Sequence, residues 1–341
     1  MLKRILLVLL ILLTGVFIWF HELITYGVEQ GVGQLKIVWN SRSVEEVLSD
    51  PFTADSVKEK LRYIQAVRQF AIDSIGLNNT SNYTTYYDQD GKELLWVVTA
   101  CEPYRLRAHN WTFPVVGKMP YKGFFDREKA KREAKKLKGQ GLDVSIRNPG
   151  GWSTLGWFQD PVLSNMLSRS AGDLASLIIH EMAHATIFVK DSADFNENLA
   201  SFIGDQGAHY FLKSHFGERS TELQSYQYDE QFYKSRTAHM LRGAIALDSL
   251  YAVIQNKSKS EKEKQKQRMI LKIVTALDTL KNSDGEKLSQ RLKKQLPNNT
   301  FFMSYIRYES RQTDFNGIYQ QQFQSDIRKM IEFYRINFPY L

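Results

Sequence analysis

The feature that most constrains the fold is a five-residue run, His180-Glu181-Met182-Ala183-His184, set in an apolar pattern of helical period. The apolar positions recur as one helix face: Leu174, Leu177, Ile178, Met182, Ala185 and Phe188. Ser170 or Asp173 can cap the start of such a helix. The pattern predicts a helix over residues 171–189 that is packed on one side and carries two histidines one turn apart.

Two imidazoles four residues apart on a helix can face one point, which suits two nitrogen ligands of a Zn²⁺ ion at about 2.0–2.1 Å. Glu181 is rotated away from the axis of His180 and His184, so it is not expected to bind the metal. It can instead act as the general base on a zinc-bound water. The alternative interpretation is that the two histidines are structural residues on the flank of the helix.

The third ligand must be a histidine or a carboxylate, because the chain has a single cysteine, Cys101. A short H-x-x-G-x-x-H extension would need Gly and His where the chain has Ile187 and Lys190. Glu197, at the start of the next predicted helix, is therefore the predicted third ligand. The alternative is that Glu197 only completes a capping box with Asp194.

The rest of the chain divides near residue 165. Helices are predicted over residues 41–76, 126–138, 195–216, 219–256, 260–295 and 317–337, and strands over residues 142–147 and 152–158. A hairpin is predicted for residues 83–87 and 94–99, with Asp90-Gly91 as its turn. The fold class is therefore α+β, with an α/β part over residues 25–165 and a mainly helical part over residues 166–341 that carries the zinc site.

The N-terminus begins with Lys3-Arg4, and no charge follows until Glu22. The apolar run between them approaches the roughly 20 residues that span a bilayer, and the positive charges favour a cytoplasmic start. We expect residues 1–24 to form a membrane anchor, with membrane contact through residues 5–23 and the remainder outside the cytoplasm. The alternative is a cleaved signal and a secreted protein.

The net charge of +8 does not indicate a nucleic-acid partner. Residues 257–294 contain 12 Lys/Arg and 5 Asp/Glu, which gives +7 within one helical stretch. A solvated helix face accounts for this charge, and contact with anionic lipid is the alternative. No nucleic-acid-binding motif accompanies it.

A peptide substrate would also need a strand beside the metal that pairs with its backbone. Residues 153–158 are β-prone, and Gly156, Trp157 and Phe158 are the predicted substrate-binding residues, where Gly156 allows close approach of a backbone. The alternative is an ordinary core strand. Glu102 and Asp160 are candidates for holding a free substrate amine.

The stretch Asp173–Gly207, with its H-E-x-x-H sequence followed by Phe195-Asn196-Glu197, resembles a bacterial family of predicted zinc aminopeptidases. Further similarity lies in Trp111–Phe125, in residues 153–161 and around Asn298-Asn299 and Tyr308. The family is of the zincin-like type with a glutamate as third ligand.

This resemblance implies one Zn²⁺ bound by His180, His184 and Glu197, with Glu181 catalytic and Tyr308 stabilising the oxyanion. It implies a zinc-dependent peptide hydrolase, an aminopeptidase. From the N-terminal apolar run, we expect the catalytic part to lie on the outer side of a bacterial inner membrane. A zinc endopeptidase and a membrane-tethered binding protein without catalysis are the alternatives. Thermolysin-type relatives have an Asp four residues after the ligand glutamate, whereas this chain has Ser201.

Overall fold

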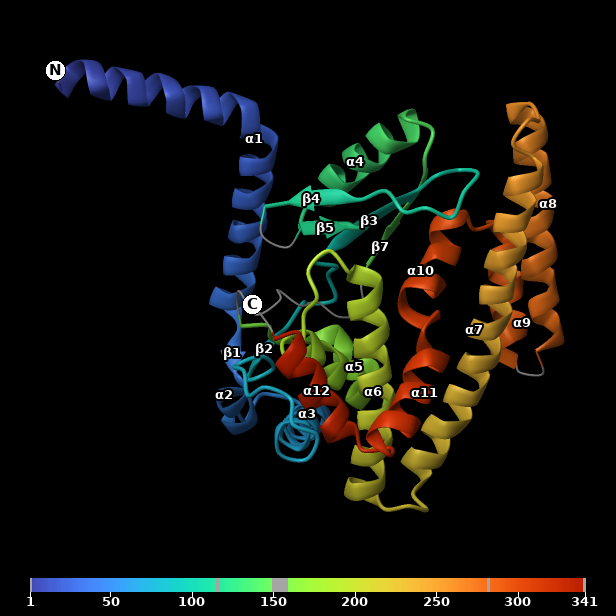
Figure 1. Ribbon diagram of the computed structural model, residues 1–341. Coiled ribbons are helices and arrows are strands. Elements are labelled where there is room, and N and C mark those ends of the chain that lie inside the picture. The colour runs from blue at the N-terminus through green and yellow to red at the C-terminus, as the bar shows by residue number, and fades with distance from the viewer. Residues whose placement is uncertain (1, 115–116, 149–158, 281–282, 340–341) are drawn as a thin grey trace.

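A computed structural model describes residues 2–114, 117–148, 159–280 and 283–339 of the chain (Figure 1). The helices up to the H-E-x-x-H sequence are α1 (Leu2–Asn40), α2 (Val44–Ser49), α3 (Asp55–Asp73), α4 (Arg127–Gly139) and α5 (Ala171–His184). Those after it are α6 (Ala193–Phe216), α7 (Thr221–Val253), α8 (Lys259–Thr275), α9 (Ser283–Lys294), α10 (Asn299–Glu309), α11 (Gln312–Phe323) and α12 (Ile327–Asn337). Short 3₁₀ helices lie at Ser164–Ser168 and Ala276–Thr279.

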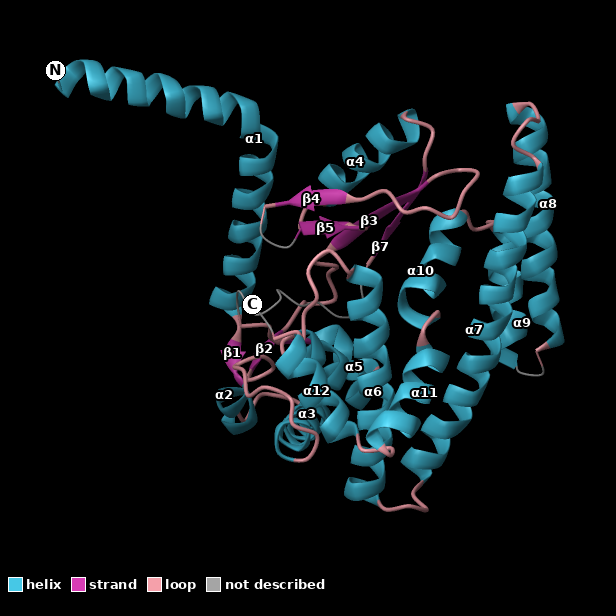
Figure 2. Cartoon of the chain, in the orientation of Figure 1, coloured by secondary structure: helices cyan, strands magenta, loops and turns pink. Residues whose placement is uncertain are grey.

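The strands are short and lie in the first half of the chain, as Figure 2 shows. They are β1 (Arg42–Ser43), β2 (Thr85–Tyr87), β3 (Trp96–Cys101), β4 (Trp111–Phe113), β5 (Gly117–Met119), β6 (Lys122–Phe124), β7 (Asp143–Arg147) and β8 (Val162–Leu163). One sheet has the order β1-β2-β8, the second has the order β6-β3-β7 with antiparallel neighbours, and β4 pairs with β5. Strands confined to the first half and helices throughout the second confirm the predicted α+β class.

Buried apolar side chains form three cores, and the largest of them combines elements from both halves of the chain. The largest is built by α2, α3, α5, α6, α11, α12, β2 and β8. A second lies between α7, α8, α9 and α10, and a third between α4 and the sheet of β3, β6 and β7. The predicted histidine helix belongs to the largest core, where Leu174 and Ile178 have no exposed surface.

Several local predictions are confirmed. Ser43 and Glu46 form a capping box at the start of α2, inside the helix predicted for residues 41–76. The apolar stripe of residues 61–71 is buried along α3. The helix predicted for residues 126–138 is α4, which Asp126 caps, and β7 covers most of the strand predicted for residues 142–147. These features depend on side chains within a few residues of one another, so the sequence determines them locally.

The hairpin prediction is wrong. The two segments lie in different sheets: β2 pairs with β1 and β8, whereas β3 pairs with β6 and β7. Asp90 and Gly91 do adopt the left-handed conformation of a turn, but the turn connects two sheets. Long-range strand partners therefore override the local hairpin signal.

Three predicted helices are interrupted. Residues 50–54, which include Pro51, separate α2 from α3, since proline disfavours helix in the residue before it. The predicted helix over residues 260–295 divides into α8 and α9. The one over residues 317–337 breaks between α11 and α12, where Gln324 and Ser325 have positive φ. Helix α10 was not predicted at all.

Helix α1 begins away from the rest of the molecule and joins it over its second half (Figure 1). Among the residues that the structure describes in full, no helix is long and apolar enough to cross a membrane. The anchor predicted for residues 1–24 stays a prediction.

Candidate metal centre

Helix α5 delivers the two histidines to one point. Ser170 accepts a hydrogen bond from the backbone N–H of Asp173 and so fixes where α5 begins. The helix ends at His184, five residues earlier than predicted, and Thr186 turns back to donate to the carbonyl of Met182. The Nε2 atoms of His180 and His184 are 3.1 Å apart.

Helix α6 crosses α5 closely enough to bring Glu197 to these histidines. The contact depends on Gly204, because a Cβ there would lie 2.8 Å from the backbone carbonyl oxygen of Ser176 and 3.1 Å from Cβ of His180. At this crossing Oε2 of Glu197 lies 3.5 Å from Nε2 of His180 and 3.3 Å from Nε2 of His184. The expected grouping of all three residues is thus present.

Two asparagines beside Glu197 hold the start of α6. Asn196 bonds both the N–H and the carbonyl of Val189, at 2.9 and 2.8 Å, and so closes the loop after α5. Asn198 accepts from the N–H of Arg311 at 2.8 Å and donates to the carbonyl of Arg307. The first links α6 to α5, and the second links α6 to the junction of α10 and α11.

The alternative of a capping box at Glu197 is excluded. Helix α6 begins after Ser192, which makes no side-chain cap, and Asp194 already lies inside the first turn. Glu197 is 7% exposed and faces the histidines. Its carboxylate is therefore placed by the crossing of two helices.

The spacing of the three ligand atoms fits a tetrahedral metal. Two atoms about 2.0–2.1 Å from one zinc ion lie about 3.3–3.4 Å apart at the tetrahedral angle. The three measured separations here are 3.1, 3.3 and 3.5 Å. Two imidazoles and one carboxylate leave a fourth position open, as in catalytic zinc sites.

The electrostatics of the three groups agree with a cation-binding site. Burial alone would raise the pKa of Glu197, but His184 and His180 outweigh it and hold that pKa far below its usual range. Burial would lower the pKa of His184, yet the Glu197 carboxylate outweighs it and raises that pKa. Glu197 is therefore ionised and ready to bind a cation.

Glu181 and Tyr308 lie beside this centre. The ring of Tyr308 stacks on that of His180, with centroids 6.5 Å apart and planes inclined by 29°. Burial and the nearby charge of Glu197 raise the pKa of Tyr308 to about 12, so its hydroxyl keeps its proton at neutral pH. The negative charge of Glu181 also acts on Tyr83 and Tyr121. Burial and nearby carboxylates raise the pKa of each of these tyrosines well above 10.

Three residues at the centre were missed by sequence reasoning. Tyr121 lies next to β6, close to Glu197 and Tyr308. Burial raises the pKa of Tyr121, and the charges of these two residues raise it further. Arg147, at the end of β7, lies 5.9 Å from the ring of Tyr308. Asp205, on α6, lies close enough to His180 for the charge of that histidine to affect its pKa. None of the three belongs to a motif, so only the fold identifies them.

Asp205 lies on α6 one turn after Ser201, which has no carboxylate. Its Oδ1 accepts from Ser176 at 3.0 Å and from Tyr226 at 3.1 Å. Burial raises its pKa, and the charge of His180 acts in the opposite direction. Asp205 is thus part of a hydrogen-bonded cluster next to a metal-ligand histidine rather than a ligand.

The remaining predicted residues are Gly156, Trp157, Phe158, Glu102 and Asp160. Gly156, Trp157 and Phe158 lie outside the described residues. Glu102 pairs with Arg107 at the end of β3. Asp160 has no exposed surface, so a substrate amine could not reach its carboxylate.

Residues 25–336 match the model of a protein family that is described as "Putative aminopeptidase". No curated protein and no solved structure matches the chain. The match includes the histidine helix, Glu197 and Tyr308, and it covers most of the sequence. The chain belongs to this aminopeptidase family.

Proposed function

We propose that the protein is a zinc-dependent peptide hydrolase of the zincin-like type, with the ion held by His180, His184 and Glu197. The observation that carries this proposal is the 3.1–3.5 Å spacing of the three ligand atoms, two of which come from the helix that also carries Glu181. Membership of the aminopeptidase family supports a peptide as the substrate. A zinc ion at such a centre polarises a carbonyl and acidifies water.

The side chains of the protein carry the proton transfers. The Glu181 carboxylate takes a proton from the attacking water and gives it to the nitrogen of the leaving amine. The Tyr308 hydroxyl, which keeps its proton at neutral pH, donates a hydrogen bond to the oxygen of the substrate carbonyl as charge develops there. Tyr121 is a second donor close to the same carboxylates.

The decisive variant is Glu181→Gln, which preserves size but removes the base. We expect wild-type and variant protein to bind equal amounts of zinc, measured by mass spectrometry, while kcat falls by about 10²- to 10⁴-fold in the variant. Equal activity of the two proteins over a broad peptide library would refute the role of Glu181. Absence of bound metal in both would refute the metal centre itself.

Family membership favours cleavage at the N-terminus of a peptide. Amino-acid amides and p-nitroanilides test for aminopeptidase activity, and internally quenched peptides with both ends blocked test for endopeptidase activity. We expect the first group to be cleaved and the second to resist. The opposite result would assign the centre to an endopeptidase.

We also propose that the catalytic part lies outside the cytoplasm. The support is the sequence alone, in which Lys3-Arg4 precedes an uncharged apolar run. A reporter enzyme that works only outside the cytoplasm, fused after Leu341, should be active. An active reporter of the cytoplasmic kind would refute this location.

A further inference from the structure

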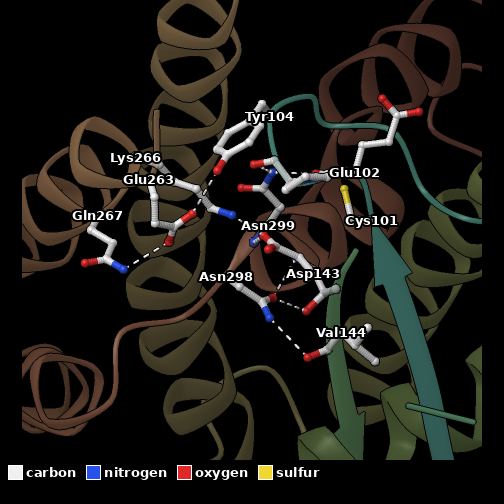
Figure 3. A network of polar contacts seen from close by, with 12 residues as sticks. Cys101, Glu102, Tyr104, Asp143, Val144, Glu263, Lys266, Gln267, Asn298 and Asn299 are labelled. Atoms are coloured by element: carbon white, nitrogen blue, oxygen red, sulfur yellow. Dashed lines mark hydrogen bonds and ion pairs between the residues drawn. The ribbon is translucent and has the colours of Figure 1, made fainter. Parts of the chain in front are cut away.

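Hydrogen bonds and an ion pair join the start of strand β7 to the start of helix α10. Lys266 binds Oδ2 of Asp143 at 2.6 Å, and the same oxygen accepts from the backbone N–H of Asn299 at 2.9 Å (Figure 3). Asn298 donates to the carbonyl of Val144 at 3.1 Å. These bonds fix where α10 starts relative to β7.

The opposite ends of β7 and α10 meet at the metal centre. From Asp143 to Arg147 the strand covers about 13 Å, and from Asn299 to Tyr308 the helix covers about 13 Å, at about 3.3 and 1.5 Å per residue. Arg147 accordingly reaches Tyr308, and its guanidinium carbon lies 5.9 Å from the ring centroid. Because the ring of Tyr308 also stacks on His180, with centroids 6.5 Å apart, the guanidinium lies within about 12 Å of that histidine ring.

Arg147 has no acidic partner in the described part of the chain. Arg147 is half-buried. Two fully buried cations do have an acidic partner: Arg307 pairs with Asp194 at 3.3 Å, and Lys266 pairs with Asp143. The polar contact of Arg147 is a long one, 3.5 Å from its Nη2 to the hydroxyl of Tyr308. Its Nε is buried without a hydrogen-bond partner.

An arginine in this state is suited to bind an anion. A guanidinium presents five donors in a planar fork that matches a carboxylate. Leaving a buried donor unpaired is unfavourable, so a carboxylate that reached Arg147 would satisfy groups that the protein leaves unsatisfied. The carboxylates of the metal centre, Glu181 and Glu197, have their own roles there and form no ion pair with Arg147 among the described residues.

We propose that Arg147 binds a carboxylate of the peptide substrate, namely the C-terminal carboxylate of a short peptide. This proposal rests on the proposed peptidase function. An extended chain covers about 3.3–3.6 Å per residue, so a carboxylate two or three residues beyond the cleaved bond spans the distance from the centre to Arg147. The substrate class is therefore peptides of about three to four residues with a free C-terminus.

The test compares tri- and tetrapeptides with a free C-terminal acid against the same peptides as C-terminal amides. Wild-type enzyme should cleave the acids with a kcat/KM about 10- to 100-fold higher, the range of a charge-assisted hydrogen bond, and mainly through KM. Arg147→Met should reduce this preference to about one, and Arg147→Lys should restore part of it. The control Arg132→Met, on the exposed side of α4, should keep the preference of the wild type.

A second arm identifies the source of the carboxylate. Amidated peptides with an Asp two residues after the cleaved bond would regain the preference if an acidic side chain were the ligand, and that result would overturn the C-terminal assignment. Equal kcat/KM for acid and amide in the wild type would overturn the proposal entirely.

The two proposals can fail separately. If zinc-loaded wild type cleaves neither peptide, the peptidase function fails. Calorimetric binding then still tests Arg147: the acid should bind at least 10-fold more tightly than the amide to wild type, and equally to Arg147→Met. The same titration with Glu181→Gln measures binding without turnover, and equal binding of acid and amide to it would contradict the proposal.

Discussion

Among single residues, Glu197 and His184 show how the protonation of the centre depends on pH. Glu197 has a lowered pKa, so its contribution to stability is present above about 4.3 and is lost as pH falls through the lower folded value. His184 has a raised pKa, so its contribution is complete below about 6.5 and is lost as pH rises through the raised value. The metal-free pair therefore stabilises the fold most between about pH 4.3 and 6.5.

A metal requires neutral imidazole, so it must displace the proton from His184. We expect the zinc affinity to increase as pH rises through the raised pKa of His184, with release of a proton on binding near pH 6.5. Calorimetric titrations in two buffers of different ionisation enthalpy measure this release. His209→Gln removes a histidine that pairs with Glu230 and should leave the pH dependence unchanged, whereas binding without proton release near pH 6.5 would contradict the expectation.

The proposed role of the Tyr308 hydroxyl as oxyanion donor can be tested by removing that hydroxyl alone. Tyr308→Phe keeps the ring that stacks on His180 and removes the hydroxyl. We expect kcat to fall by about 10- to 1000-fold, the range for a lost oxyanion donor, while zinc content stays at the wild-type level. If kcat is unchanged, the donor lies elsewhere, and Tyr121→Phe is the next variant to measure.

For the helices, the crossing of α5 and α6 controls the geometry of the site. Gly204→Ala would place a Cβ against the backbone of α5, which cannot move aside as a flexible side chain can. We expect a loss of about 1–3 kcal/mol in the free energy of unfolding, measured with urea, and a weaker zinc affinity because Glu197 shifts with α6.

Gly317→Ala is the matched control for that crossing. Gly317 lies in α11, and a Cβ added there meets no atom within 4 Å. Because alanine favours helix, this variant should be more stable by about 0.5–1 kcal/mol with unchanged zinc affinity. A Gly204→Ala protein that behaves like Gly317→Ala would show that the crossing is not tight.

Elements determined by neighbouring residues could be predicted from the sequence. The stripe from Leu174 to Met182 and the cap at Ser170 define α5, and the His180–His184 spacing follows from the helix itself. Helix α10 could not be predicted, because Asn298 and Asn299 start it through bonds to a strand more than 150 residues away. Pairing of β3 with β7 escaped prediction for the same reason.

The difference between local and long-range determinants also explains which site residues could be predicted from the sequence. His180, Glu181 and His184 lie in one motif, and Glu197 lies at the expected distance after it. Tyr308 was chosen through a family resemblance, since nothing local separates it from 16 other tyrosines. Arg147 reaches the centre only because β7 and α10 extend side by side over the same length.

In the whole molecule, the metal centre lies where distant parts of the chain share one core. That core includes Leu61 from α3, Ile178 from α5 and Met330 from α12, all without exposed surface. Residues near both ends of the chain therefore support the helices that hold the ligands. The second core, between α7, α8 and α10, supports the centre indirectly through α10.

Helix α1 contacts the rest of the molecule over only part of its length. Two truncated proteins can show which part of α1 contributes to stability. The Tyr26 hydroxyl donates to the carbonyl of Gly123 at 3.0 Å, and its ring packs against Phe113 and Phe124. Further along α1, Ile37 is 5% exposed. The family match begins at residue 25, just before these contacts.

We expect a fragment of residues 25–341 to keep the Tm and zinc affinity of the full chain, because the contacts from Tyr26 onward remain. A fragment of residues 41–341 should lose stability by several kcal/mol, at about 1.5–3 kcal/mol for each large apolar side chain that loses its burial. Tyr26→Ala in the full chain tests the same contact without truncation, and Val28→Ala, at a position 60% exposed, is its control. Equal stability of both fragments would mean that α1 contributes nothing to the fold, whereas an equal loss in both would mean that residues before 25 also pack against it.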